Sequence, residues 1–390
     1  MSEDGLQRDA LPGPLHGVRV LDIGGIGPGP FAGLVLADMG ADVVRVDRPG
    51  GTAIFPGSPS LDVLNRGKRS VCLDLKHPGA VEALLTLAAG SDIVIEGHRP
   101  GVAERLGFGP EKCRESNAPL VYGRMTGWGQ DGPLAQRAGH DISYIALTGA
   151  LHAIGPAGGS PQIPLNLVGD FGGGGTYLVM GVLAALLEAR LTGVGRTVDA
   201  AIVDGTAHLL AGTHGLMNTG TWEDDRGVNM FDGGAPYYAV YETADGGHMA
   251  VGAIEPPFYA ALLAVLEVRD VDPARQNDRS TWPHTRQVFA RAFASRTRAE
   301  WTALFAPTDA CTAPVLSLRE AADDPHLRHR GTVVDRDGFI QPAPAPRFSG
   351  TETAVSSPPP EPGQHTRQVL ESAGVDAERL IRDRAAHQAG

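Results

Sequence analysis

The stretch "VLDIGGIGPGPFAGLVLADMGADVVRVD", residues 20–47, sets the fold of this chain. A β-branched run leads into the spacing Gly27-x-Gly29-x-x-Ala32, an apolar helix pattern follows, and a second β-branched run ends at Asp47. A strand, a glycine turn, a helix and a second strand form a βαβ unit, in which the two strands run parallel in one sheet. We therefore expect a parallel sheet that begins in these residues.

The same glycine spacing is the fingerprint of dinucleotide-binding folds, but two prolines argue against that ligand. The fingerprint needs backbone N–H groups that point at a pyrophosphate. Pro28 and Pro30 stand inside the turn and have no N–H group. A tight turn between strand and helix explains the glycines equally well, so we predict such a turn with close approach of some ligand, and not an NAD site.

The alternation of strand-like and helix-like runs continues along the chain. Strand patterns occur at 18–24, 42–47, 70–75, 92–97 and 120–125, and helix patterns at 31–39, 79–89 and 101–115. This alternation is typical of an α/β fold, in which helices cover a parallel sheet. After "FGGGG" at 171–175, an apolar run predicts one long helix over 176–193 that ends at Gly193.

The pattern changes after about residue 205 and predicts a second, smaller domain. Residues 237–253 form two period-two runs around a Gly-Gly turn, which predicts a β-hairpin, and helix patterns follow at 257–267, 285–295 and 298–305. Further on, "PAPAPRFSG" and "SSPPPEPG" are typical of extended connectors. A last helix is expected over 365–387.

Composition and charge narrow the function classes. The chain has 390 residues, 42% of them hydrophobic, and a net charge of −12 with scattered basic residues, which argues against a nucleic-acid or membrane surface. Three widely spaced cysteines predict neither a zinc site nor a disulfide framework. The first 13 residues lack a targeting pattern, the apolar run at 177–187 is short for a membrane span, and the ending "HQAG" is not a peroxisomal address. We expect a cytoplasmic protein.

Basic residues recur at corresponding places in the predicted sheet. Each alone is typical of a solvated surface charge, but an arginine at the carboxyl edge of a parallel sheet is well placed to bind a phosphate. Several of them together favour a phosphorylated ligand. They are Arg48, Arg66, Lys68, Arg69, Lys76, Arg99 and Arg105.

Three acidic or imidazole side chains are candidates for chemistry. His140, in "RAGHDISYIALTG", is explained either by a hydrogen-bonded core histidine or by a group that moves a proton, and Asp141 beside it could orient its ring or cap a helix. Asp170 precedes the glycine run, where it could cap a helix or stand beside exposed N–H groups that stabilise an anion. Glu255 could be only a first-turn carboxylate.

Six stretches in a fixed order carry a resemblance to a known family. The resemblance runs from about residue 13 to about residue 350. The stretches are "GIGPGPFAGLVLADMGADVVRVDRPG", "EGHRPGVAERLGFGP", "RMTGWGQDGPLAQRAGHDISY", "LNLVGDFGGGG", "DGGAPYYAVYE" and "VGAIEPPFYAALLA". With them the chain resembles the family III CoA-transferase superfamily of CaiB/BaiF type, and within it the α-methylacyl-CoA racemases.

The resemblance implies a Rossmann-like large domain and an interlocked homodimer. The large domain would span 1–205 and be completed by the return segment 330–390, whose helix packs on it. A linker helix would follow at 206–228, and a small α/β domain with the hairpin and helices at 229–329.

The resemblance also implies the residues of a CoA thioester site. Catalytic residues of similar racemases fall on His140, Asp170 and Glu255. CoA phosphates would be contacted by Arg48, Arg99 and Arg105, with Lys76 near, and the CoA path would be lined by Ile26, Leu73, Val94 and Tyr144. Neither a metal nor a redox cofactor is expected, because CoA is part of the substrate.

Inverting the carbon next to a thioester carbonyl requires one group that removes a proton and another that returns one on the opposite face. His140 and Asp170 are the predicted pair, Glu255 would support His140, and N–H groups at the start of the 176–190 helix would stabilise the enolate oxygen. The alternative is a CoA-transferase, in which Asp170 attacks the thioester. Transferases of this superfamily usually carry an aromatic residue where His140 stands. A pliable acyl surface could come from Met125, Met217, Met230 and Met249.

Overall fold

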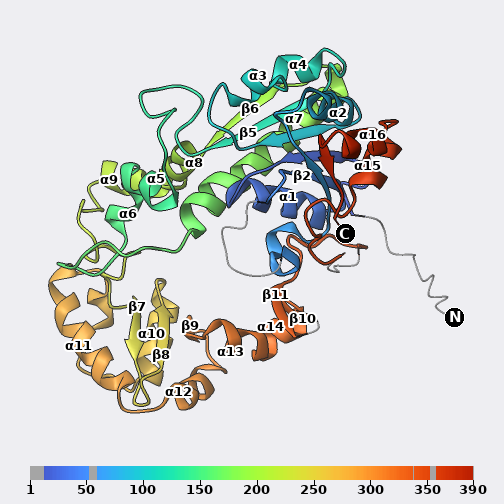
Figure 1. Cartoon of the computed structure of the whole chain (residues 1–390). Helices are drawn as coiled ribbons and strands as arrows, with labels where there is room; N and C mark the ends of the chain where they lie inside the picture. Colours follow the sequence, from blue (N-terminus) through green and yellow to red (C-terminus); the bar gives the residue numbers. More distant parts are fainter. Residues whose placement is uncertain (1–12, 52–58, 337, 352–356, 390) are drawn as a thin grey trace, which may run out of the picture. The chain divides into compact units, whose positions relative to one another are not determined.

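The computed structural model describes residues 13–51, 59–336, 338–351 and 357–389 (Figure 1). The chain divides into a large unit, which comprises Met1–Thr148, Leu165–Leu209 and Gly331–Gly390, and a second unit, which comprises Gly149–Pro164 and Leu210–Arg330. Three parts of the sequence discussed above lie outside the described residues. They are most of the N-terminal stretch that was searched for a targeting pattern, part of the second proline-rich connector, and Gly390.

The large unit contains a sheet in the order β12-β3-β2-β1-β4-β5-β6. The strands from β3 to β6 pair in parallel, as residues 20–47 predict, and β12 pairs antiparallel with β3. This is the classical Rossmann order, with a switch point between β1 and β4, where connections leave in opposite directions. The strands are β1 (Arg19–Ile23), β2 (Asp42–Asp47), β3 (Lys68–Leu73), β4 (Ile93–Glu96), β5 (Val121–Thr126), β6 (Thr197–Ala201) and β12 (Ala386–His387).

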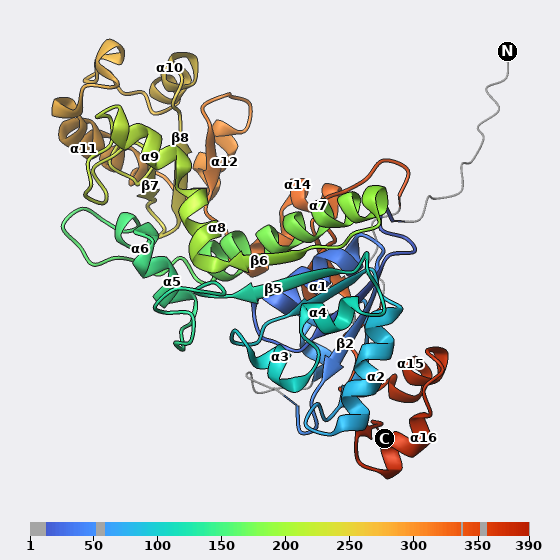
Figure 2. The ribbon, with the colours of Figure 1, turned by 90° about the horizontal axis from the view of Figure 1, so that it is seen from above.

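Helices cover both faces of this sheet, so alternate strand residues enter two hydrophobic cores (Figure 2). On one face, Leu21 and Val71 pack with α2 (Pro78–Ala89), α15 (Thr366–Ser372) and α16 (Ala377–Arg382). On the other, Val20 and Val43 pack with α1 (Pro28–Asp38) and α7 (Tyr177–Thr192). The shorter helices of this unit are α3 (Val102–Leu106), α4 (Pro110–Arg114), α5 (Asp141–Leu147) and α8 (Ile202–Leu209).

The return segment is part of the large unit. Ala386 pairs with Leu73, and the Thr366 hydroxyl accepts the Cys72 N–H at 3.1 Å. β10 (Val333–Arg336) and β11 (Phe339–Pro342) form a separate antiparallel pair. The single helix predicted over 365–387 is two helices, because the chain turns between them at Gly374, whose φ is +76°.

The second unit has a core of its own, in which Tyr237, Tyr259, Phe289 and Phe293 are buried. The hairpin expected over 237–253 consists of β7 (Tyr238–Glu242) and β8 (His248–Gly252), and β9 (Thr312–Pro314) pairs with β8. The helices of this unit are α6 (Ala150–Ala153), α9 (Ala211–Asn218), α10 (Pro256–Val265), α11 (Trp282–Phe293), α12 (Arg298–Phe305), α13 (Leu318–Asp323) and α14 (Pro325–Arg330).

The unit boundaries differ from the expected ones in two places. Residues 149–164 group with the second unit, because Arg226 donates hydrogen bonds to the backbone oxygens of His152 and Gly159. The expected linker helix at 206–228 is divided: α8 belongs to the large unit, where it packs on residues 167–176, and α9 belongs to the second unit.

The long helix begins earlier than its sequence pattern indicates. Ten residues, η3 (Leu167–Thr176), form a π-helical segment that continues directly into α7. The combined helix has 26 residues and is long and apolar enough to cross a membrane, so the length argument made from 177–187 is wrong. A buried core helix passes the same test, and α7 packs on β5 and β6 (Figure 2).

Candidate active site

The carboxyl edge of the parallel sheet collects most of the predicted ligand-binding residues. Because parallel strands end at the same edge, the loops after β1, β2, β3 and β4 bring Ile26, Arg48, Lys76 and Arg99 to that edge. Arg105 lies one turn further on, in α3. The side chains of Arg48, Lys76, Arg99 and Arg105 are exposed. The β1 and β4 loops flank the switch point, where ligands bind in open α/β sheets.

Three other cations belong to the scaffold. Lys68 and Arg69 are the first residues of β3, so they lie at the amino end of that strand, opposite the carboxyl edge. Arg69 pairs with Asp42 at 2.6 Å, and Arg66 is buried against Asp38 at 2.7 Å. The hypothesis that these residues join a phosphate site is therefore wrong.

Two of the predicted lining residues do not offer a side chain to a ligand. Leu73 and Val94 have no exposed surface and lie in the core beneath α2, so their predicted place along the CoA path is wrong for their side chains. Ile26 is exposed at the β1 loop, and Tyr144 is buried.

Asp170 lies against the start of α1. A Cβ atom on Gly27 would stand 2.9 Å from Asp170 Oδ2, and Gly27 has a φ of +66°, so glycine is required there twice over. Asn166, the residue before η3, donates to the same oxygen at 3.3 Å. We did not predict this partner, although its position four residues before Asp170 is a signal that could have identified it.

Burial raises the pKa of Asp170, and the hydrogen bond from Asn166 opposes that rise. The charge of Asp141 also raises this pKa, and a charge on His140 lowers it. Asp170 and His140 are therefore within electrostatic reach of each other in the large unit. A half-buried carboxyl with a raised pKa is suited to both accepting and donating a proton.

His140 is the residue before the first turn of α5 and its side chain is exposed. Its side chain makes no capping hydrogen bond, so the imidazole does not cap the N-terminus of α5. Its neighbour Asp141 is buried, and Asp141 Oδ1 accepts the backbone N–H of Asp170 at 2.7 Å. The elements that carry His140 and Asp170 are thus joined directly.

Tyr144, in α5, interacts electrostatically with both Asp170 and Arg99. Burial raises the pKa of its hydroxyl, the charge of Asp170 raises it further, and Arg99 lowers it. Gly139 leaves room for the ring, since a Cβ there would come within 2.6 Å of it, and Trp128 packs edge-on at 4.7 Å. Tyr144 therefore connects the surroundings of Asp170 with Arg99.

The glycine run after Asp170 serves packing. A Cβ on Gly174 would lie 3.1 Å from Pro28 and Ile202, one on Gly175 would lie 2.7 Å from Phe31, and Gly173 presses on Thr206. The glycines allow η3 to pack between α1 and α8. Since the helix continues through them, the expected free N–H groups at the start of the 176–190 helix are not at a helix start, and that prediction is wrong.

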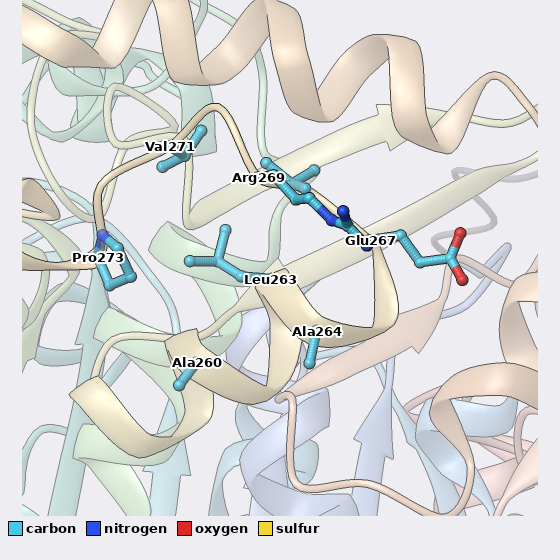
Figure 3. Close-up of a pocket in the computed structure, with 8 residues that line it drawn as sticks. Ala260, Leu263, Ala264, Glu267, Arg269, Val271 and Pro273 are labelled. Atoms are coloured by element: carbon cyan, nitrogen blue, oxygen red, sulfur yellow. The ribbon is translucent and has the colours of Figure 1, made fainter.

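Glu255 belongs to the second unit, whereas His140 and Asp170 belong to the large unit. It is an exposed residue of the second unit, immediately before α10, near Cys311. A hollow of about 600 Å³ also lies on this unit, beside α10 and the loop after it (Figure 3). Leu263, Val271 and Pro273 line it, and it holds none of the predicted catalytic residues.

Met125 and Met249 are buried in the cores rather than available to an acyl chain.

The family of the chain follows from comparison with known proteins. The sequence profile of CoA-transferase family III matches residues 15–366. The chain belongs to CoA-transferase family III. Among the described residues, no group of three His, Cys, Asp or Glu side chains could hold a metal ion.

Relatives within family III agree with this membership over nearly the whole chain. The alpha-methylacyl-CoA racemase of Mus musculus is 44% identical over 369 residues, which are 94% of this chain and 95% of that protein. The alpha-methylacyl-CoA racemase of Homo sapiens is 42% identical over the same length and the same shares. A CaiB/BaiF family protein from Brucella suis has a similar solved structure, with a TM-score of 0.79, 25% identity, and coverage of 93% of this chain and 100% of that one.

Proposed function

We propose that this protein is a racemase that inverts the α-carbon of 2-methylacyl-CoA thioesters. The observation that carries the proposal is that Asp141, the neighbour of His140, bonds to the backbone of Asp170, and that His140 and Asp170 interact electrostatically. The racemase names of the relatives at 42–44% identity support the same chemistry.

In the proposed reaction, one member of the pair takes the α-proton and the electron pair of the C–H bond moves into an enolate, whose charge rests on the thioester oxygen. The protonated form of the other member then donates a proton to the opposite face of the carbon. The raised pKa of Asp170 favours its use in both directions. These proton transfers need no metal or redox cofactor.

The enolate oxygen needs backbone donors near the pair. The first N–H groups of a helix have no acceptor within the helix. The first turn of α5, directly after His140, supplies such donors. At the start of α1, opposite Asp170, Pro28 and Pro30 have no N–H group, so Gly29 carries the one donor among the first three residues. We place the oxyanion at one of these helix starts. Glu255 stays a prediction of the resemblance, with a supporting role toward His140.

The phosphates of CoA are assigned to Arg48, Arg99 and Arg105, with Lys76 near. Arg48 is exposed and donates to the Gly51 carbonyl at 3.0 Å, which holds its guanidinium at the loop after β2. Phosphate contacts remain the same along the reaction, so they contribute to KM more than to kcat.

We expect Arg48→Ala to raise KM for the thioester about 10- to 100-fold, the loss of one charge-assisted hydrogen bond, while kcat changes little. Steady-state kinetics measures both constants. Arg19→Ala, an exposed arginine at the opposite edge of the sheet, is the matched control and should leave KM unchanged. A fall in kcat at constant KM would contradict the assignment of Arg48.

A homodimer is also part of the proposal. Met180, Leu187 and Leu191 are exposed on α7 at spacings of two turns and one turn, with Leu187 64% and Leu191 80% exposed. An apolar stripe of this kind indicates a contact surface, and we assign it to a second copy of the chain. Leu187→Glu should shift the protein toward monomer in analytical ultracentrifugation; an unchanged dimer would remove α7 from the interface.

Cytoplasmic localisation remains a prediction.

The function is tested by incubating one enantiomer of a 2-methylacyl-CoA in deuterated water and following the α-proton by NMR. Loss of the α-proton signal with inversion, and with no acceptor acid present, supports the racemase. Turnover that requires an acceptor acid, without exchange, would instead support the CoA-transferase alternative, in which Asp170 is the nucleophile.

A further inference from the structure

The buried carboxylate of Asp141 has a use that capping its own helix does not explain. It is the first residue of α5 and is only 8% exposed. Its Oδ1 accepts the Asp170 N–H at 2.7 Å, while Oδ2 is buried and has no hydrogen-bond partner among the described residues. A buried, half-satisfied carboxylate is costly. Its bond at 2.7 Å goes to the backbone of the proposed acid–base residue.

The surrounding residues are shaped to this contact. Gly169 also donates its backbone N–H to Asp141. A Cβ at Gly169 would collide with Asp141 Oδ1 and would lie 2.8 Å from Ile145. Since the first π-helical bond in η3 is Phe171 N–H to Asn166 O, the N–H groups of Gly169 and Asp170 precede it and need an outside acceptor.

We propose that Asp141 is a positioning residue that fixes Asp170 relative to His140, which stands beside it in the sequence; this inference rests on the proposed function. A bond from the start of α5 to the start of η3 keeps both proton-transferring groups on one rigid junction. Misplacement of a reacting group by about 1 Å can cost about 100-fold in rate, so this junction bears directly on turnover.

The charge of Asp141 has a second effect on the same residue. Asp170 faces Asp141 and His140 on the α5 side, Asn166 directly before η3, and Tyr144, whose hydroxyl also feels the charge of Arg99. Directly before α1 it meets Gly27, which carries no charge. Asp141 adds to the rise in the pKa of Asp170. Removing that charge while keeping the acceptor should therefore lower the pKa of Asp170.

Two substitutions separate position from charge. Asp141→Asn keeps a carbonyl oxygen for both N–H groups, and Asp141→Ala removes the acceptor. For Asp141→Asn we expect the Asp170 carboxyl to titrate at lower pH than in the unaltered enzyme, measured by ¹³C NMR on ligand-free protein, with the signal assigned from Asp170→Asn. For Asp141→Ala we expect kcat to fall about 100-fold with little change in KM. Asp131→Asn, an exposed aspartate, is the charge-matched control and should alter neither measurement.

The NMR titration separates this inference from the proposed function. An Asp141→Ala enzyme with full kcat would overturn the positioning role, and an Asp170 titration that is the same in Asp141→Asn as in the unaltered enzyme would overturn the effect of the Asp141 charge. Should Asp141→Ala fail to fold, the kcat of Asp141→Asn decides on position: this variant keeps the acceptor, so a fall of about 100-fold would overturn the positioning role. An unaltered enzyme that exchanges no α-proton refutes the proposed function instead, and leaves the titration unaffected.

Discussion

Asp170→Ala and His140→Ala should each abolish inversion, and each should leave exchange of a different enantiomer. With one group removed, the other can still take the α-proton of the enantiomer that faces it and return a solvent deuteron to the same face. It cannot deliver a proton to the opposite face. General acid–base groups contribute about 10²- to 10⁴-fold, so we expect racemisation to fall by about that factor in both variants.

The measurement is deuterium exchange by NMR, run separately on the 2R and 2S thioesters. The pattern we expect is complementary: one enantiomer exchanges in Asp170→Ala, the other in His140→Ala, and neither inverts. His284→Ala, an exposed histidine of α11 in the second unit, is the control and should behave as the unaltered enzyme. Both variants exchanging the same enantiomer would show that the two groups do not stand on opposite faces.

Lys68→Ala should cause the largest loss of stability in the large unit. Lys68 is fully buried, and its ammonium donates to Asp22 at 2.9 Å, to the Pro30 carbonyl at 2.9 Å and to Asn65 at 3.0 Å. Removing it leaves Asp22 as a buried charge without its partner, which typically costs about 3–5 kcal/mol. Its bond to Pro30 also ties the first turn of α1 to the scaffold.

Urea unfolding of Lys68→Ala, followed by a probe in the large unit, measures this loss. Arg69→Ala is the matched control, since the neighbouring ion pair with Asp42 is partly exposed and is expected to contribute about 0–1 kcal/mol. A double variant, Lys68→Met with Asp22→Leu, should recover much of the loss, because an apolar pair replaces the buried charges. Equal free energies of unfolding for Lys68→Ala and Arg69→Ala would refute the account of this pair.

The sequence predicts the sheet well because parallel strands buried on both faces have strong patterns. The glycine turn at 24–29, the strands after it and the cations at the strand ends follow from that pattern. What the sequence does not show is which strand end each cation occupies and which partner it has: Lys68 and Arg69 begin β3 and so lie at its amino end, away from the carboxyl edge. Their ion pairs with Asp22 and Asp42 give them a structural role.

In the candidate site, too, the sequence predicts the residues but not the contacts between them. His140 and Asp170 are recognisable as candidates because of their neighbours in sequence, but the bond from Asp141 to the Asp170 backbone joins residues 29 positions apart, which no local pattern reveals. The glycine run suggested substrate approach, whereas its glycines meet Pro28, Phe31 and Thr206. A glycine run indicates that another group lies close to the backbone, and the fold is needed to show whether that group is a ligand or a helix.

The pairing of β12 with β3 has a consequence for how the protein is made. Until residues 386–387 leave the ribosome, β3 is an open edge of a hydrophobic sheet, and Leu73 and the core beside it wait for α15 and α16. Contacts this far apart in sequence form slowly, and unpaired edges invite aggregation. The nascent large unit should accordingly depend on chaperone protection until β12 has emerged and paired with β3.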